Sequence, residues 1–190
     1  MRYYQLVIIC LLLLILLFGR FLITPQTIIG TIGGDLFIDN NWPQAKIYST
    51  YPFSNRAELL LNVGSRDGAE EMMPVTIDGE LLIGQIIKVF DNYSVARTVF
   101  DPDWELSVRV GIQQIDALLE GGATPRLTMV AKNKEFMEGQ VVYSASKDFR
   151  YGTPLGTVEK IEDSPTAVFR EAELSVPYNF NDLREVTVGR

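Results

Sequence analysis

The stretch from Leu59 to Gly84 constrains the fold most strongly, because it alternates short apolar runs with turn signals. The pairs Asp67-Gly68 and Asp78-Gly79 interrupt runs that are rich in leucine, isoleucine, valine and methionine. An Asp-Gly pair between such runs is a strong hairpin signal, since glycine adopts the positive φ that primed turns require. The stretch therefore predicts a strand, a turn, a second strand, a second turn and a third strand.

The same pattern continues to the end of the chain, with turn signals at intervals of roughly eight to twelve residues. Such spacing is typical of β-sandwiches and barrels. The run 81–89 suits a buried strand with a bulge or a close backbone approach at Gly84. A short helix within 112–120 is the one helical alternative. The predicted strands are Lys46–Thr50, Glu58–Val63, Met73–Ile77, Leu81–Val89, Ser94–Phe100, Leu106–Val110, Ala117–Leu119, Arg126–Val130, Gln140–Ser144, Thr157–Ile161, Ala167–Ser175 and Glu185–Val188.

The first 44 residues have a different composition. Residues 3–23 are apolar except for Gln5, Gly19 and Arg20, and as a helix they span roughly 31 Å, close to the ~30 Å hydrocarbon core of a bilayer. A cleaved signal peptide is the alternative, but no small-residue cleavage site follows the run. We therefore expect residues 1–23 to form a transmembrane anchor and residues 24–44, with their prolines and glycines, to form a flexible linker.

The distribution of charge indicates the side of the membrane and excludes several functions. Basic residues are sparse after Arg20, which favours a cytoplasmic N-terminus and an extracytoplasmic head formed by residues 45–190. Charges in 1–44 balance, so the head carries the whole net charge of −7. An acidic head argues against binding to nucleic acid or to anionic lipid. The chain has no His and one Cys, Cys10, so we expect neither a metal site nor a cofactor nor a disulfide in the head.

One short fragment could carry catalytic chemistry. Ser144 and Lys147 spell S-x-x-K, which holds the nucleophile of penicillin-binding enzymes on one face of a helix. Here the fragment follows an apolar run that predicts a strand, and the companion motifs of those enzymes are absent. We expect no enzymatic activity, and a Ser-Lys hydrolase of another arrangement stays as an alternative.

Asp101, Asp103 and Glu105 alternate as at the start of a calcium-binding loop. Such a loop also needs a glycine and a glutamate, where this chain has Leu106 and Ile112. The three acids are therefore interpreted as part of a turn, which the Asp-Pro pair initiates, and as a solvated strand edge.

Two arginines and several aromatic residues are candidates for contact with a partner. Arg97 and Arg109 lie in apolar strands, where we expect either pairing with carboxylates such as Asp101 or Asp67 or contact with a partner. Any single aromatic residue near a turn is expected to be part of the core, whereas a group of them exposed together would form a protein-binding site. The candidates for such a surface are Tyr93, Trp104, Phe149 and Tyr151.

Several spaced segments resemble the MreC family, the membrane-anchored rod-shape proteins of bacteria. They are NVGSRDGAEEMMPV, LLIGQIIKV, YSVARTVFDP, LSVRV, EFMEGQVVYS, TPLGTVEKI and LREVTVG, which lie between Asn62 and Gly189. The resemblance as a whole covers roughly residues 45–189. The resemblance assigns structural roles, mostly in turns, to Gly64, Asp67, Gly68, Pro74, Gly84, Asp101, Pro102, Arg109, Gly139 and Gly156.

The resemblance implies a mainly β fold, with a single N-terminal transmembrane helix followed by two small packed β-barrel subdomains. The second subdomain would be formed by roughly 95–150, and the C-terminal strands would complete the first. The implied function is that of a non-catalytic scaffold in the inner membrane, which maintains cell shape by recruiting and activating peptidoglycan synthases. Its implied partners are a class B penicillin-binding transpeptidase, MreD in the membrane and the actin-like MreB in the cytoplasm.

The linker is the clearest departure from the family pattern. Typical members carry a coiled coil between anchor and head, but residues 24–44 contain no apolar heptads. We therefore expect a weak homodimer at most. The remaining alternative is an adaptor subunit of a secretion or efflux assembly, although such subunits usually bring a long helical hairpin that this sequence lacks.

Overall fold

The computed structural model describes residues 43–49, 55–163 and 166–189. The predicted anchor, 1–23, and nearly all of the predicted linker, 24–44, lie outside the described residues. Within the three described ranges, no helix combines the length and the apolar character needed to cross a membrane. The described residues belong to one compact unit of the chain and contain twelve strands, which form two sheets.

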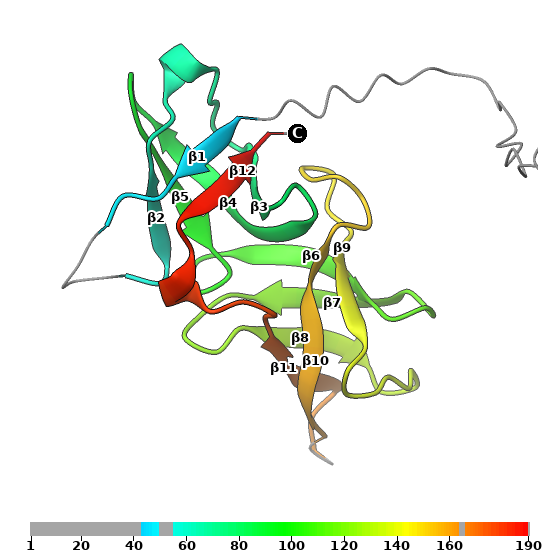
Figure 1. The fold of residues 1–190 in the computed structure, drawn as a ribbon. Coiled ribbons are helices and arrows are strands. Elements are labelled where there is room, and N and C mark those ends of the chain that lie inside the picture. Colours follow the sequence, from blue (N-terminus) through cyan, green and yellow to red (C-terminus); the bar gives the residue numbers. More distant parts are fainter. Residues whose placement is uncertain (1–42, 50–54, 164–165, 190) are drawn as a thin grey trace, which may run out of the picture. The chain divides into compact units, whose positions relative to one another are not determined.

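The first sheet is a half-barrel (Figure 1). Its strands are β1 (Gln44–Lys46), β2 (Glu58–Leu61), β3 (Pro74–Ile77), β4 (Leu81–Val89), β5 (Ser94–Thr98) and β12 (Glu185–Val188). They pair in the order β1-β12-β3-β4-β5-β2. The two end strands meet only at an isolated bridge between Ile47 and Leu61, where the amide of Tyr48 donates a hydrogen bond of 2.8 Å to the carbonyl of Leu60. The prediction of two barrels is therefore confirmed only in part.

The second sheet is a closed barrel. Its strands are β6 (Glu105–Val110), β7 (Ile115–Glu120), β8 (Arg126–Ala131), β9 (Val141–Ser144), β10 (Pro154–Glu162) and β11 (Phe169–Ser175). The order β10-β11-β8-β7-β6-β9 returns to β10, because β9 pairs with both β6 and β10. A closed sheet has no free edge strand, so the barrel leaves no backbone ladder open to aggregation.

Two interpretations of the sequence differ from this architecture. The helix considered within 112–120 is wrong: residues 115–120 form β7, which pairs with β6 and β8 and buries alternate side chains. The strands of the second barrel run from residue 105 to residue 175 rather than through roughly 95–150. Both β10 and β11 are needed to close it, so β12 alone returns to the half-barrel.

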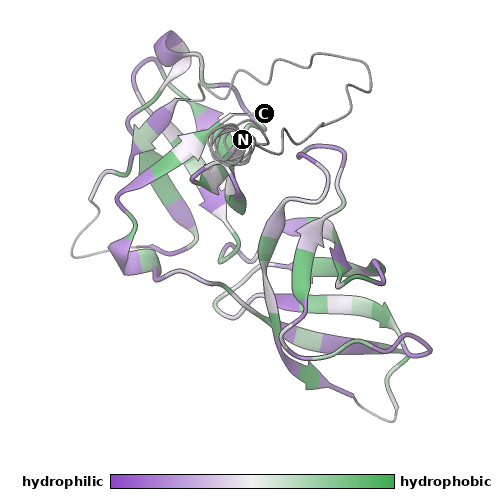
Figure 2. Cartoon of the chain, turned by 45° about the vertical axis from the view of Figure 1, so that its right-hand side comes forward, coloured by the Kyte–Doolittle hydropathy of each residue, from purple (hydrophilic) through white to green (hydrophobic). Residues whose placement is uncertain are grey.

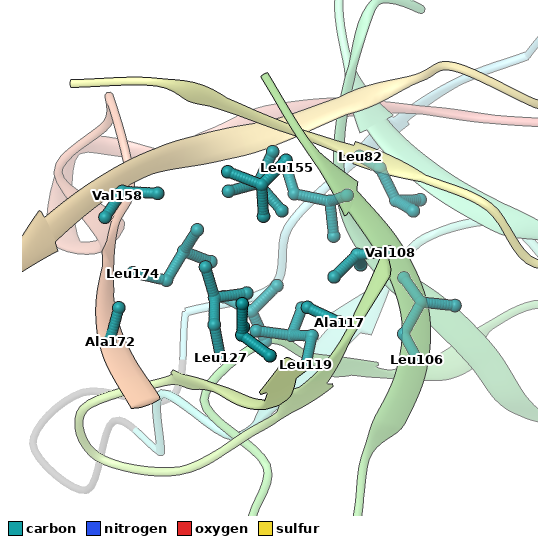
Figure 3. Packing of buried hydrophobic residues seen from close by; sticks show 14 of the residues in the cluster. Leu82, Leu106, Val108, Ala117, Leu119, Leu127, Leu155, Val158, Ala172 and Leu174 are labelled. Atoms are coloured by element: carbon teal, nitrogen blue, oxygen red, sulfur yellow. The ribbon is translucent and has the colours of Figure 1, made fainter. Parts of the chain in front are cut away.

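Each sheet encloses a hydrophobic core. In the closed barrel, Leu119, Leu127 and Leu174 point toward one another from three strands (Figure 3). Hydrophobic and hydrophilic residues mingle along the strands of both sheets, as expected where one face is buried and the other is wet (Figure 2). Tyr178 and Phe180, which lie between β11 and β12, pack against both cores and tie the two sheets together.

Two glycine positions of the half-barrel have clear physical causes. Gly79 (φ 74°) and Asp78 (φ 53°) both have positive φ, which is the primed hairpin turn predicted between β3 and β4. At Gly84 an added Cβ would lie 2.1 Å from the carbonyl oxygen of Arg97 on β5. The close backbone approach predicted at Gly84 is therefore confirmed.

Candidate functional site

The four aromatic candidates do not form one exposed surface. Trp104 and Phe149 are buried, 4% and 8% exposed, and their rings pack edge to face at 6.3 Å between centroids. Tyr93 follows β4 and stacks on Phe90 at 4.3 Å, whereas Tyr151 is 60% exposed and lies in the turn before β10. The interpretation of Trp104 and Phe149 as surface residues is wrong, because both rings complete the core of the closed barrel.

Tyr151 belongs to a polar cluster on the outside of the closed barrel. Arg109 extends outward from β6, and its Nε donates a hydrogen bond of 2.9 Å to Asp116 Oδ1 on β7. A second guanidinium nitrogen donates to the hydroxyl of Tyr151, which in turn donates to Gln114 at 3.3 Å. The hydrogen bonds to Asp116 and then to Tyr151 raise the pKa of Arg109 above its usual value. The guanidinium therefore stays charged throughout the physiological range.

The tip of the β6–β7 hairpin stands beside this cluster. Its residue Ile112 is 99% exposed, which is unusual for a large apolar side chain. We name Arg109, Ile112, Gln114, Asp116 and Tyr151 the hairpin surface. It offers an apolar tip, an aromatic ring and a charged donor, which are the side-chain types that dominate protein interfaces.

Both arginines pair with carboxylates, as expected, but only Arg97 does so with one of the two acids named from the sequence. Arg97 lies 3.9 Å from Asp101, as predicted. Arg109 pairs with Asp116 instead of Asp101 or Asp67, because residues 109 and 116 face each other across the β6–β7 ladder. Such cross-strand neighbours could have been found from the hairpin register.

The S-x-x-K fragment does not form a catalytic site. Ser144 ends strand β9, is 1% exposed, and its hydroxyl has no hydrogen-bond partner among the described residues. A nucleophile must reach its substrate and must also be activated by a base. Ser144 meets neither requirement, and the strand geometry differs from the helical face that the motif needs.

The acids near residue 101 form a turn, as interpreted from the sequence. Asp101 Oδ1 accepts a hydrogen bond of 2.9 Å from the amide of Asp103. In the described part of the chain, no group of three or more His, Cys, Asp or Glu residues could hold a metal ion.

A tight turn connects β2 to β3 in the segment that carries the strongest motif. Gly64 precedes a short 3₁₀ helix, η1 (Ser65–Asp67), and donates its amide to Asp67 Oδ2 at 2.9 Å. Gly68 ends the helix with φ 84°. An added Cβ at Gly64 would lie 2.3 Å from the carbonyl oxygen of Phe90, so this turn packs directly on the end of β4.

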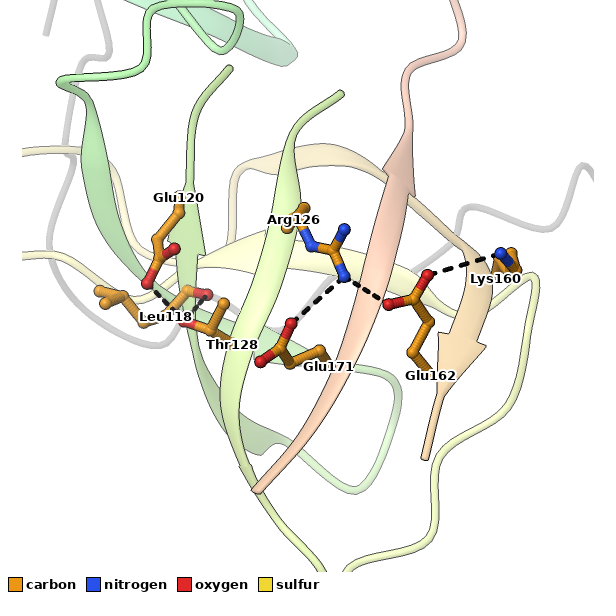
Figure 4. A network of polar contacts seen from close by, with 7 residues as sticks. All are labelled: Leu118, Glu120, Arg126, Thr128, Lys160, Glu162 and Glu171. Carbon is orange, nitrogen blue, oxygen red and sulfur yellow. Dashed lines mark hydrogen bonds and ion pairs between the residues drawn. The ribbon is translucent and has the colours of Figure 1, made fainter. Parts of the chain in front are cut away.

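A second polar cluster connects three strands of the closed barrel (Figure 4). Arg126 on β8 pairs with Glu162 on β10 and, at 3.2 Å, with Glu171 on β11, and Lys160 lies 3.4 Å from Glu162. The hydrogen bond from Arg126 lowers the pKa of Glu162 below its usual value and raises the pKa of Arg126. Because all charges of the cluster are paired, its role is to hold strands together.

A groove that was not predicted from the sequence lies between the outer faces of the two sheets. One wall consists of the outer face of β4 and β5 with Glu71 and Met72, and the other consists of β6, β7 and residues 146–149. The volume of this inter-sheet groove is about 610 Å³. The one sequence feature that could have indicated the groove is Leu118, an apolar residue at an outward-facing position of β7.

The comparison with protein families gives one match. The family model "Rod shape-determining protein MreC, barrel core" matches residues 47–190, and no curated protein matches the chain. Among solved structures, one described as MreC has a TM-score of 0.70 at 20% identity, covering 80% of this chain and 89% of that one.

Two further structures have informative descriptions. One is the major periplasmic domain from the cell shape-determining filament MreC, with a TM-score of 0.65 at 21% identity, covering 77% of this chain and 93% of that one. The other is MreC from Helicobacter pylori in complex with the penicillin-binding protein PBP2, with a TM-score of 0.60 at 16% identity. That match covers 78% of this chain and 98% of the other. At these identities the likeness shows the fold.

Proposed function

The chain belongs to the MreC family of rod shape-determining proteins, and on that premise we propose that it is a membrane-anchored scaffold that recruits and activates a class B penicillin-binding transpeptidase. The family consists of non-catalytic cell-shape proteins. The observation that carries the proposal is the match over residues 47–190, which includes every strand of both sheets except β1. The complex of the Helicobacter pylori relative with PBP2 supports this choice of partner.

The proposed location is the inner membrane, with the head on its outer side. The apolar run 3–23 supports an anchor, and the charges around it favour a cytoplasmic N-terminus. The description of a related domain as periplasmic agrees with this orientation. An anchor confines the head to a thin layer beside the bilayer, which raises its effective concentration for partners tethered in the same membrane. MreD and MreB, which the resemblance implies, would bind the anchor and its cytoplasmic end.

The hairpin surface is the proposed contact for the transpeptidase. Ile112 and Tyr151 are exposed and lie on the closed barrel around the charged Arg109. Tyr93, the exposed candidate of the half-barrel, is a proposed secondary contact. Aromatic and arginine side chains that lose water on binding contribute most of the free energy of an interface.

Co-purification tests the proposal. The full-length tagged chain is extracted from membranes in a mild detergent, and the retained proteins are labelled with a fluorescent penicillin. We expect a labelled class B transpeptidase on the wild-type chain and a loss of about tenfold for the Ile112→Ser/Tyr151→Ala variant. Tyr48→Ala is the control, since Tyr48 is also exposed but lies on the half-barrel. Failure of the wild-type chain to retain any labelled transpeptidase would contradict the proposed function.

A further inference from the structure

We propose that the inter-sheet groove binds a cationic, extended peptide segment of a partner protein, with an apolar side chain between basic ones. The proposal rests on the proposed function only in treating the chain as a protein-binding scaffold. Four features carry it: the size of the groove, its unpaired carboxylates, its apolar patches, and the acidity of the head.

The size of the groove fits a short segment of chain. Its volume of about 610 Å³ lies within the range of about 300–1,000 Å³ that is typical of ligand sites. The strands of its walls are hydrogen-bonded in pairs, β4 with β5 and β6 with β7, with one irregularity in β4 between Ile86 and Lys88. The groove is therefore built from rigid elements and exists before a partner arrives.

The charges that line the groove are mostly uncompensated. Four exposed carboxylates, those of Glu71, Asp103, Glu105 and Asp148, come from separate parts of both walls. None of them takes part in an ion pair with another described residue. The one cation of the lining, Arg97, lies beside Asp101 and donates to the carbonyl of Asp103. The groove therefore attracts cations and repels anions.

Apolar side chains lie among these carboxylates. Ile87 on β4 and Leu118 on β7 are both partly exposed, and Leu118 lies between two buried neighbours, Ala117 and Leu119. Met72 is 55% exposed and its backbone has φ 70°. The nearly buried amide of Gln85 donates to the carbonyl and to the sulfur of Met72, which fixes this loop at the mouth of the groove. A flexible methionine adapts to varied apolar partners.

The net negative charge of the head favours a partner protein over a second copy of this chain as the occupant of the groove. The net charge of −7 makes two heads repel each other. A simple ion would use the carboxylates but leave the apolar positions in water. A segment that alternates basic and apolar side chains can contact both the carboxylates and the apolar positions, because an extended strand presents successive side chains to opposite sides.

The probe is the peptide Lys-Val-Lys-Val-Lys with a neutral fluorophore, titrated by fluorescence anisotropy. The protein is the full-length chain in nanodiscs of zwitterionic phosphatidylcholine, which the peptide does not bind electrostatically. We expect saturable binding that weakens as salt is added. The variant Glu71→Gln/Glu105→Gln should weaken it about tenfold and Met72→Asn about threefold, since both remove contacts from the groove while asparagine tolerates positive φ.

The matched control is Glu138→Gln/Glu159→Gln, which removes two exposed carboxylates of the closed barrel that lie outside the groove. It should change the affinity less than twofold. Peptides with Ser in place of Val should bind at least threefold more weakly, and peptides with Glu in place of Lys should not bind. Unchanged melting temperatures show that the variants fold.

Three results would overturn the inference. They are absence of saturable binding to the wild-type chain, an equal loss in the control variant, and a wild-type dimer that the groove variants abolish. The co-purification experiment described above distinguishes failure of the groove proposal from failure of the proposed scaffold function. If the peptide does not bind while the wild-type chain retains the transpeptidase, the groove proposal fails and the scaffold function stands. If the peptide binds and no transpeptidase is retained, only the scaffold function fails.

Discussion

At the scale of single residues, burial decides whether a serine hydroxyl is available for chemistry. Ser144 and Ser94 carry hydroxyls that are buried and have no partner among the described residues. Burying a hydroxyl without a hydrogen bond costs free energy, which is recovered when an apolar group of similar size replaces it. The motif selects Ser144 as a nucleophile, but its buried hydroxyl is better explained as a group that lowers the stability of the core.

Ser144→Ala should consequently be neutral or stabilising. Alanine removes the unpaired hydroxyl from the closed barrel and adds no volume, so we expect the melting temperature to stay level or to rise by a few degrees. Differential scanning calorimetry of residues 39–190 measures this. A clear fall in melting temperature would show that the hydroxyl has a partner, and loss of partner activation in the variant would reopen the Ser-Lys alternative.

The Arg126 cluster makes stability depend on pH. Arg126 lowers the pKa of Glu162 below its ordinary value of 4.5. A carboxylate with a depressed pKa stabilises the folded state above its ordinary pKa, and this contribution is lost as the pH falls through the folded value. We expect Glu162→Gln to lower the melting temperature slightly at pH 7, and we expect this difference to shrink as the pH falls below 4.5 and through the depressed pKa of Glu162. Glu159→Gln on the same strand should show no such pH-dependent difference; if it matches Glu162→Gln at every pH, the pairing explanation is wrong.

At the scale of elements, the turn around η1 tests how far backbone conformation was predictable. Gly68 has φ 84°, and an added Cβ would meet nothing within 4 Å. Any loss of stability on substitution therefore comes from backbone strain rather than from a clash. This separates Gly68 from Gly64 and Gly84, where neighbouring carbonyl oxygens exclude a side chain.

Gly68→Val should cost about 1–3 kcal/mol, because a β-branched residue is strained at positive φ. The melting temperature of residues 39–190 should fall by several degrees. Gly68→Asn is the matched control and should lose much less, since asparagine adopts the left-handed conformation more readily. Equal melting temperatures for all three proteins would contradict the positive φ at this position.

The elements themselves were largely predictable, because their signals are local. Each of the twelve predicted strands overlaps an observed one, although the first, Lys46–Thr50, shares only Lys46 with β1, and the Asp78-Gly79 hairpin has the expected conformation. The assignment of strands to sheets was less predictable. Pairing of β11 with β8 joins residues about forty positions apart, and no local pattern encodes it. For the same reason the sequence could not decide which of the four aromatic candidates are buried, and the outward-facing Leu118 was the one local signal of the groove between the sheets.

At the scale of the whole molecule, the linker expected over residues 24–44 lies almost wholly outside the described residues, so the distance between head and membrane stays a prediction. A chain of that length would reach at most about 70 Å when fully extended, and one that behaved as a flexible tether would span roughly 25 Å. The head would thus stay near the membrane, where a tethered transpeptidase is also confined. Without a coiled coil, partner binding rather than dimerisation would have to organise the assembly.

The isolated head should accordingly be monomeric. We expect residues 39–190 to sediment as a monomer at micromolar concentration, since the net charge of −7 opposes self-association. Sedimentation equilibrium at low and physiological salt measures this. A tight dimer at both salt concentrations would mean that the surface of the head replaces the coiled coil.

The central claim, that this chain is a non-catalytic activator, is tested most directly by reconstitution. The full-length chain and a purified class B transpeptidase are placed in the same liposomes with a glycan-strand substrate, and the rate of cross-linking is measured. We predict that the wild-type chain and Ser144→Ala raise the rate severalfold by co-localisation, that Ile112→Ser/Tyr151→Ala does not, and that the chain alone forms no cross-links. An unchanged rate with the wild-type chain, or cross-linking by the chain without the transpeptidase, would contradict the account.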